Sequence, residues 1–153
     1  MDVRYQFMLA NDIYNLARFM EAQEPVYARV VAELTAGEKQ SHWMWFIFPQ
    51  LRGLGSSQMA QHYGIANVDE ASAYLQHPVL GFRLRECTRL VCALQNRTLD
   101  EIFGYPDNAK FHSCVTLFNQ ATQNHIFAEA LEKYFGRAPD EATLRLLDHD
   151  SKV

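Results

Sequence analysis

The chain has 153 residues, of which 48% are hydrophobic and 21% charged, and its formal net charge is −4. This length suits one ordinary domain that buries about two thirds of its unfolded surface. The hydrophobic fraction argues against intrinsic disorder, and the small negative charge argues against a broad surface for nucleic acids or anionic membranes.

Helix signals begin near the N-terminus. Asn11 is placed to cap a first helix. Its apolar face would comprise Ile13, Leu16, Ala17 and Met20. Pro25 suits the first turn of a second helix, which Gly37 can end in a left-handed conformation. Ser41 is a candidate cap for a short helix that must stop before Pro49.

Two further helices are marked by polar residues that suit a helix start. Ser56 or Ser57 opens a helix that Gly64 ends. Asn67, followed by two acidic residues, opens the next, which closes near His77.

The longest predicted helix runs from Pro78 to about Asn96. Its apolar seam comprises Leu80, Leu84, Cys87, Val91 and Leu94. Thr98 then starts a short helix that Gly104 ends.

Three more helices are predicted, one starting at Asp107, one from Asn124 to Phe135 and one from Pro139 to Leu147. No stretch alternates between apolar and polar residues as a strand would. The sequence therefore predicts an all-α fold, a single compact multi-helical domain of about eight or nine helices over residues 1–153. Residues 1–10 and 148–153 would be terminal extensions.

The segment from His42 to Phe48 contains both tryptophans, Trp43 and Trp45, and two phenylalanines. A short helix that is aromatic on every side is typical of a core, because each such side chain buries ~150–250 Å². The alternative is that the indoles line a binding pocket with His42 at its mouth, where His42 could act as a general acid or base.

Charge placement marks two helix starts as unusual. Most predicted helices carry an acidic residue in the first turn, as the helix dipole favours, but those after Ser41 and Gly55 do not. Lys39 and Arg52 lie just before them. The turn after Arg52 supplies candidate anion-binding residues: Gly53, Gly55, Ser56 and Ser57. An ordinary serine-capped helix after a glycine turn is the alternative.

A third cluster surrounds Asp107 and Lys110, which lie on one helix face, with Ser113 close by. Lys110 either pairs with Asp107 at the surface or points into a pocket and supplies a second positive charge for a phosphate. The histidines show no HExxH or HxxxH spacing, so we expect no metal site, and we expect no cofactor. Cys87, Cys92 and Cys114 form no CxxC pair and predict reduced thiols in the core.

Five motifs together resemble a bacterial family catalogued as domain of unknown function 1810, whose members are often labelled calpastatin. They are FxxAQ (19–23), GxKxxHWMWFIFPQ (37–50), GLGSS (53–57), YLxHPxLGxRLxE (74–86) and DxxKFxS with TLF (107–118). The likeness spans about residues 12–147 and implies a mainly α-helical fold, with no established activity to carry over. Calpastatin-type inhibition through extended, proline-rich segments is inconsistent with a helical chain that has only five prolines.

Two functions follow as hypotheses. The first is a pocket for a small phosphorylated or nucleotide-like ligand, such as an ADP-ribose- or NAD-related compound, with hydrolase or transferase activity as one form. Its candidate catalytic residues are His42, Asp107 and Lys110. Its candidate ligand-binding residues are Lys39, Trp43, Trp45, Gln50, Arg52, Gly53, Gly55, Ser56, Ser57 and Ser113. The second is a non-catalytic module that docks a protein partner on the aromatic segment. The absence of a basic-then-apolar leader and of an apolar run of ~18 residues predicts a soluble, cytoplasmic chain.

Overall fold

Residues 12–151 of the computed structural model are described, and they form ten helices with one isolated parallel bridge, Leu51 to Ile65. The helices are α2 (Ala17–Gln23), α3 (Tyr27–Ala36), α4 (Met44–Ile47), α5 (Gln58–His62), α6 (Val68–Gln76), α7 (Leu80–Ala93), α8 (Leu99–Ile102), α9 (Asp107–Ala121), α10 (Ile126–Phe135) and α11 (Glu141–Ser151). The all-α prediction is confirmed, and the described residues form ten helices where about eight or nine were predicted. None of these helices is both long and apolar enough to cross a membrane.

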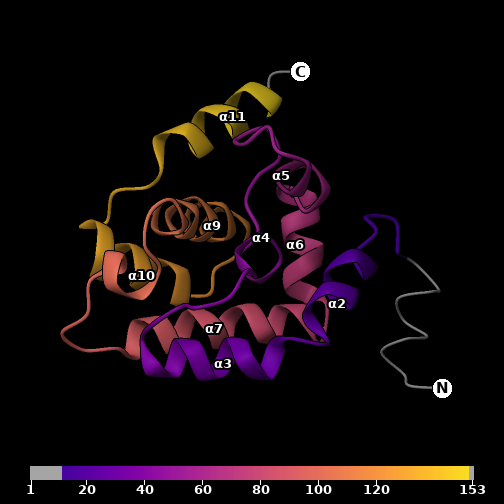
Figure 1. Cartoon of the computed structure of the whole chain (residues 1–153). Helices are drawn as coiled ribbons and strands as arrows, with labels where there is room; N and C mark the ends of the chain where they lie inside the picture. Colours follow the sequence, from indigo (N-terminus) through magenta and orange to yellow (C-terminus); the bar gives the residue numbers. More distant parts are fainter. Residues whose placement is uncertain (1–11, 152–153) are drawn as a thin grey trace.

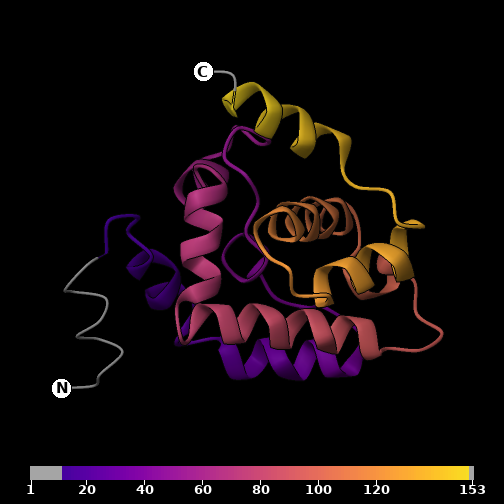
Figure 2. The ribbon, with the colours of Figure 1, turned by 180° about the vertical axis from the view of Figure 1, so that it is seen from behind.

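Helix α9 lies in the middle of the domain and is seen almost end-on in Figures 1 and 2. Helices α6, α10 and α11 pack against it, and α7 joins α6 and α10 beneath it. Helix α3 runs alongside α7 on its outer side (Figure 2). The short α4 occupies the interior between α9 and α6, so the aromatic segment passes through the centre of the fold (Figure 1).

Most predicted helix boundaries follow the local signals. Gly37 ends α3 with φ +77°, and Gly136 ends α10 with φ +58°. Asn67 caps α6 by accepting from the Glu70 N–H, and Thr98 forms a reciprocal capping box with Glu101. These confirmed boundaries depend only on contacts within one helical turn.

The first helix differs from its prediction. Asn11 lies outside the described residues, and α2 begins only at Ala17, which leaves Ile13 83% exposed. The Asp12 carboxylate accepts from the backbone N–H groups of Leu16 and Ala17, at 2.6 and 2.8 Å. The chain therefore turns before α2 starts, and Ile13 lies off the buried face.

Helices α6 and α7 meet at a tight joint. His77 is buried, and its Nδ1 accepts from the N–H groups of Val79 and Leu80. Burial lowers the pKa of His77, which suits a neutral ring in this role. Helix α7 therefore starts at Leu80 instead of Pro78, and it ends at Ala93, before Asn96. A Cβ at Gly81 would lie 2.0 Å from the Leu75 carbonyl oxygen, so only glycine fits there.

The predicted role of the cysteines is confirmed for two of them. Cys87 and Cys114 are fully buried, Cys92 is half-buried, and all three are free thiols. Burial raises the pKa of Cys87 to about 12 and that of Cys92 to about 11. Thiols with such pKa values stay protonated near neutral pH and serve as small apolar side chains.

A buried arginine joins α2 to the start of α6. Arg18 donates to the carbonyl oxygens of Tyr14, Asn15, His62 and Gly64 and forms a 2.7 Å ion pair with Glu70. The side chains of Arg18 and Glu70 are only 6% and 3% exposed. All five N–H donors of the guanidinium are therefore used.

Candidate functional site

The aromatic segment is mostly core. Trp43, Phe46 and Phe48 are 1%, 8% and 0% exposed, whereas Trp45 is half-buried. The Trp43 indole N–H donates to a Glu33 oxygen at 2.9 Å. The structure thus assigns Trp43 to the core, against the prediction that it contacts a ligand directly, and leaves Trp45 as the indole that reaches the surface.

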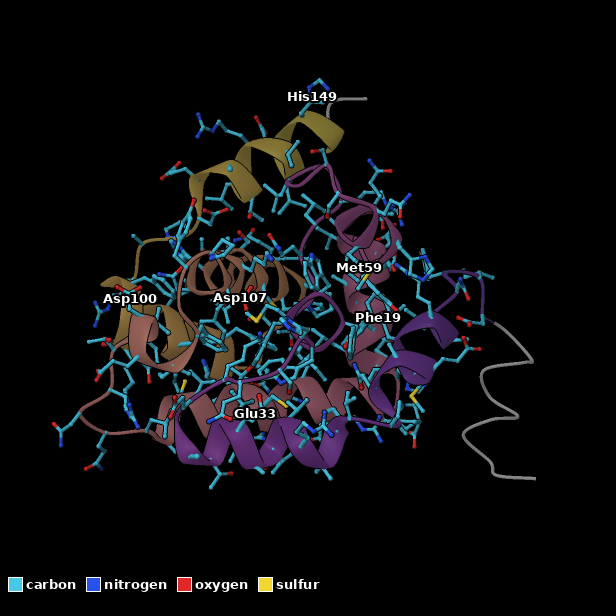
Figure 3. The ribbon with its side chains drawn as sticks, in the orientation of Figure 1. Phe19, Glu33, Met59, Asp100, Asp107 and His149 are labelled. Atoms are coloured by element: carbon cyan, nitrogen blue, oxygen red, sulfur yellow. The ribbon has the colours of Figure 1, made fainter. Side chains whose placement is uncertain are left out.

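The predicted bare helix end near Ser41 is wrong. Helix α4 begins only at Met44, and Ser41 does not cap it. Glu33 of α3 instead accepts from the N–H groups of Gln40 and Ser41 and from the Ser41 hydroxyl. Figure 3 shows Glu33 on the side of α3 that faces this segment. An acid from a neighbouring helix therefore already occupies the place proposed for an anion.

The ionisation of Glu33 reflects this network. Burial of the carboxylate opposes its charge, but the hydrogen bonds from Ser41, Gln40 and Trp43 outweigh burial and lower its pKa to about 2. The ordinary value is 4.5. Because the folded-state pKa lies below the unfolded one, ionised Glu33 stabilises the fold above pH 4.5, and this contribution is lost as the pH falls towards 2.

We expect Glu33→Gln to lower the free energy of unfolding at pH 7 by about 2 kcal/mol, because a neutral amide accepts weaker hydrogen bonds than a carboxylate and its nitrogen cannot accept from the Ser41 hydroxyl. The difference from the wild type should shrink below pH 4.5. Urea unfolding at pH 7 and pH 3, with the exposed Glu21→Gln as control, measures both effects. An equal loss at the two pH values would contradict the assignment.

Two lysines meet on one carboxylate. Lys39 Nζ lies 2.9 Å from Asp107 Oδ2, and Lys110 Nζ lies 3.3 Å from Asp107 Oδ1. The three side chains are 9%, 19% and 17% exposed for Lys39, Lys110 and Asp107 respectively. The backbone N–H of Lys39 donates to the Ile102 carbonyl at the end of α8, which brings Lys39 to the start of α9. The Asp107–Lys110 pair is therefore not a simple surface pair.

Each ammonium group also lies over an indole. Lys39 Nζ is 5.1 Å from the Trp43 ring centroid, and Lys110 Nζ is 4.2 Å from that of Trp45. The structure thus joins two clusters that are far apart in the sequence, the aromatic segment and the start of α9. We call Lys39, Asp107 and Lys110 the lysine–aspartate triad.

A shallow hollow, which we call the Trp45 hollow, lies beside Trp45. Its lining includes Trp45, Gln50, Leu54, Gly55, Met59 and Tyr63. In Figure 3 the α4 segment lies between Asp107 on α9 and Met59 on α5, so Trp45 links the triad to this hollow. The volume of the hollow is about 10 Å³, which leaves room for about one water molecule. A ligand as large as a nucleotide would therefore lie across the Trp45 hollow, not inside it.

The glycine turn at residues 53–57 gives less support to an anion site than its sequence indicates. Ser57 caps the five-residue α5 by accepting from the Ala60 N–H at 3.1 Å, as predicted. Arg52 donates to the Gly64 carbonyl at 2.9 Å, so its guanidinium is already engaged. Gly55 lines the Trp45 hollow. Anion binding by Gly53, Ser56 and Ser57 stays a prediction.

The remaining candidates are separate from the triad. His42 is exposed, and no hydrogen bond or ion pair described for residues 12–151 joins it to Asp107 or Lys110. Ser113 is buried and donates to the carbonyl of Ala109 and to the carboxylate of Asp140. The bond to Asp140 ties α9 to the residue that precedes α11. Within the described part of the chain, no three His, Cys, Asp or Glu side chains cluster as a metal site would require.

Sequence reasoning missed Glu33 and Met59. Glu33 follows the buried Val30 by three positions and precedes the buried Leu34, so it borders the apolar stripe of α3. An acid at the edge of such a stripe is a signal for a partner on a neighbouring segment. Met59 carried no comparable signal, because its role depends on where α5 packs.

Comparison with other proteins agrees with this architecture. A search of curated proteins finds no match. The crystal structure of the conserved hypothetical protein Rv1873 from Mycobacterium tuberculosis is similar at 56% identity, with a TM-score of 0.86 over 88% of this chain and 96% of that one. The profile of the DUF1810 family, described as protein of unknown function, matches residues 13–147. The chain therefore belongs to the DUF1810 family.

Proposed function

We propose that this protein binds a small phosphorylated ligand that carries a flat, nucleotide-like ring. The anion would contact Lys39 and Lys110, and the ring would lie against Trp45 and across the Trp45 hollow. The observation that carries the proposal is the convergence of two ammonium groups on one carboxylate, with Lys110 4.2 Å from the half-buried Trp45 ring.

The charges of the triad favour an anion. Two lysines face a single aspartate, which leaves one positive charge in excess. A lysine ammonium has three N–H donors; Asp107 accepts one from Lys110 and forms an ion pair with Lys39. Donors therefore remain for phosphate oxygens, and the low exposure of the three side chains reduces screening by solvent.

The surroundings of Trp45 favour a flat ring. An indole face can stack on a base or a nicotinamide, a contact worth ~1–3 kcal/mol in single-stranded nucleic-acid sites. Gln50 and the backbone at Gly55 border the same hollow and supply polar groups next to the apolar Met59 and Leu54. This mixture is typical of ligand sites, in which a few polar groups orient an otherwise apolar contact.

We propose binding, not a reaction, because His42, the candidate general acid or base, is exposed, and no hydrogen bond or ion pair described for residues 12–151 joins it to Asp107 or Lys110. The protein-docking alternative has less support, because burial of Trp43, Phe46 and Phe48 removes most of the aromatic segment from the surface.

Intrinsic fluorescence provides a direct test, since the only two tryptophans each lie beside a triad lysine. We expect at least one of pyrophosphate, AMP, ADP-ribose and NAD to change the emission at low salt. Lys110→Met should weaken that binding about tenfold or more, because a charge-assisted contact is lost. Arg89→Gln on α7 removes the same charge at a half-exposed site and should leave the affinity unchanged. If no ligand changes the emission, or Lys110→Met binds as the wild type does, the proposal fails.

A further inference from the structure

The two oxygens of Asp107 are divided between the two lysines. Oδ2 contacts Lys39 at 2.9 Å and Oδ1 contacts Lys110 at 3.3 Å, so the carboxylate bridges the ammonium groups. A phosphate that contacted both lysines would need the same space between them. Asp107 is the first residue of the fifteen-residue α9, so the backbone of the helix, as well as the lysines, keeps it between the two ammonium groups.

We infer that Asp107 is the specificity-determining residue of the triad: it acts as a built-in competitor that admits polyphosphates and excludes singly charged anions. This inference rests on the proposed function of the site. A singly charged carboxylate ligand would only replace the contacts that Asp107 already makes. A diphosphate brings more negative charge and more acceptor oxygens, so it gains contacts even while Asp107 keeps a share of the lysine donors.

Asp107 could have either of two roles in the triad. If Asp107 only held the lysines in place, its removal would weaken every anion alike. If Asp107 competes, its removal should strengthen binding, and should strengthen it most for anions of low charge. The ratio of pyrophosphate affinity to acetate affinity is therefore the informative quantity.

The test compares the wild type with Asp107→Asn and Asp107→Ser, each titrated with acetate, phosphate, pyrophosphate and ADP at low salt. Calorimetry and tryptophan emission are read together, and thermal unfolding checks that each variant folds. We expect both variants to bind phosphate about tenfold or more tighter than the wild type and to show a smaller preference for pyrophosphate over acetate. The double variant Asp107→Asn/Lys110→Met should lose most of the gain. Comparison of ADP with pyrophosphate shows whether the ring contributes.

The outcomes distinguish this inference from the proposed function. If the wild type binds an anion and both variants bind it equally well or more weakly, the competitor role is overturned and the proposed function still stands. Binding by the variants but not by the wild type would show that Asp107 blocks the lysines to every anion, which overturns both the proposed function and the selectivity for polyphosphates. Binding by none of the proteins overturns both.

Discussion

Arg18→Met should lower the free energy of unfolding by about 3–5 kcal/mol, the usual loss when one partner of a buried ion pair is removed. The Glu70 carboxylate, 3% exposed, would be left without its cation. The His62 carbonyl oxygen would lose its guanidinium donor as well, whereas the Gly64 carbonyl oxygen would keep the one from Arg52. Urea unfolding at 25 °C, followed by circular dichroism, measures the loss.

Two further variants identify the cause. Arg137→Met removes an ion pair with Glu132 in which both side chains are more than half exposed, so it should change the free energy of unfolding far less than Arg18→Met does. Adding Glu70→Gln to Arg18→Met should recover part of the stability, since no buried charge then remains. A double variant as unstable as the sum of its single changes would show that the ion pair is not the source.

Gly81→Ala is expected to destabilise the protein by about 3 kcal/mol, towards the upper end for overpacked sites. In an ordinary helix the same change would stabilise by about 1 kcal/mol, because alanine is the better helix former. Here the new Cβ would lie 2.0 Å from the Leu75 carbonyl oxygen, so α6 and α7 must separate. Chemical denaturation gives the sign as well as the size of the effect.

Gly136→Ala is the matched control for this change. No atom beyond its own residue and its two chain neighbours lies within 4 Å of the added Cβ, and only the positive φ of +58° opposes alanine. A loss of about 1 kcal/mol is expected from that conformation. If Gly81→Ala proved as mild as Gly136→Ala, the close approach of α6 to α7 would not be as tight as the structure gives it.

The sequence predicted parts of the candidate site but not their arrangement. Lys39, Lys110, Asp107 and Trp45 were all selected from local features, such as a charge before an aromatic run or an acid at a helix start. Their mutual contacts could not be derived, because nothing in the spacing of residues 39, 45 and 107 indicates that α8 anchors Lys39 beside α9. The prediction for Ser41 failed for the same reason: Glu33, on another helix, accepts the hydrogen bonds of Ser41 and supplies the acid that this segment lacks.

The sequence by itself determined the all-helical class and most helix ends, as at Gly37, Asn67 and Thr98. Those features depend on apolar periodicity and on caps that bond within one turn, so distant parts of the chain cannot change them. Only the tertiary structure decided that Trp43 is core, that Trp45 reaches the surface and that two lysines share Asp107. Those outcomes depend on how α3, α4 and α9 pack together, which is set by the fit of many side chains at once and not by any local pattern.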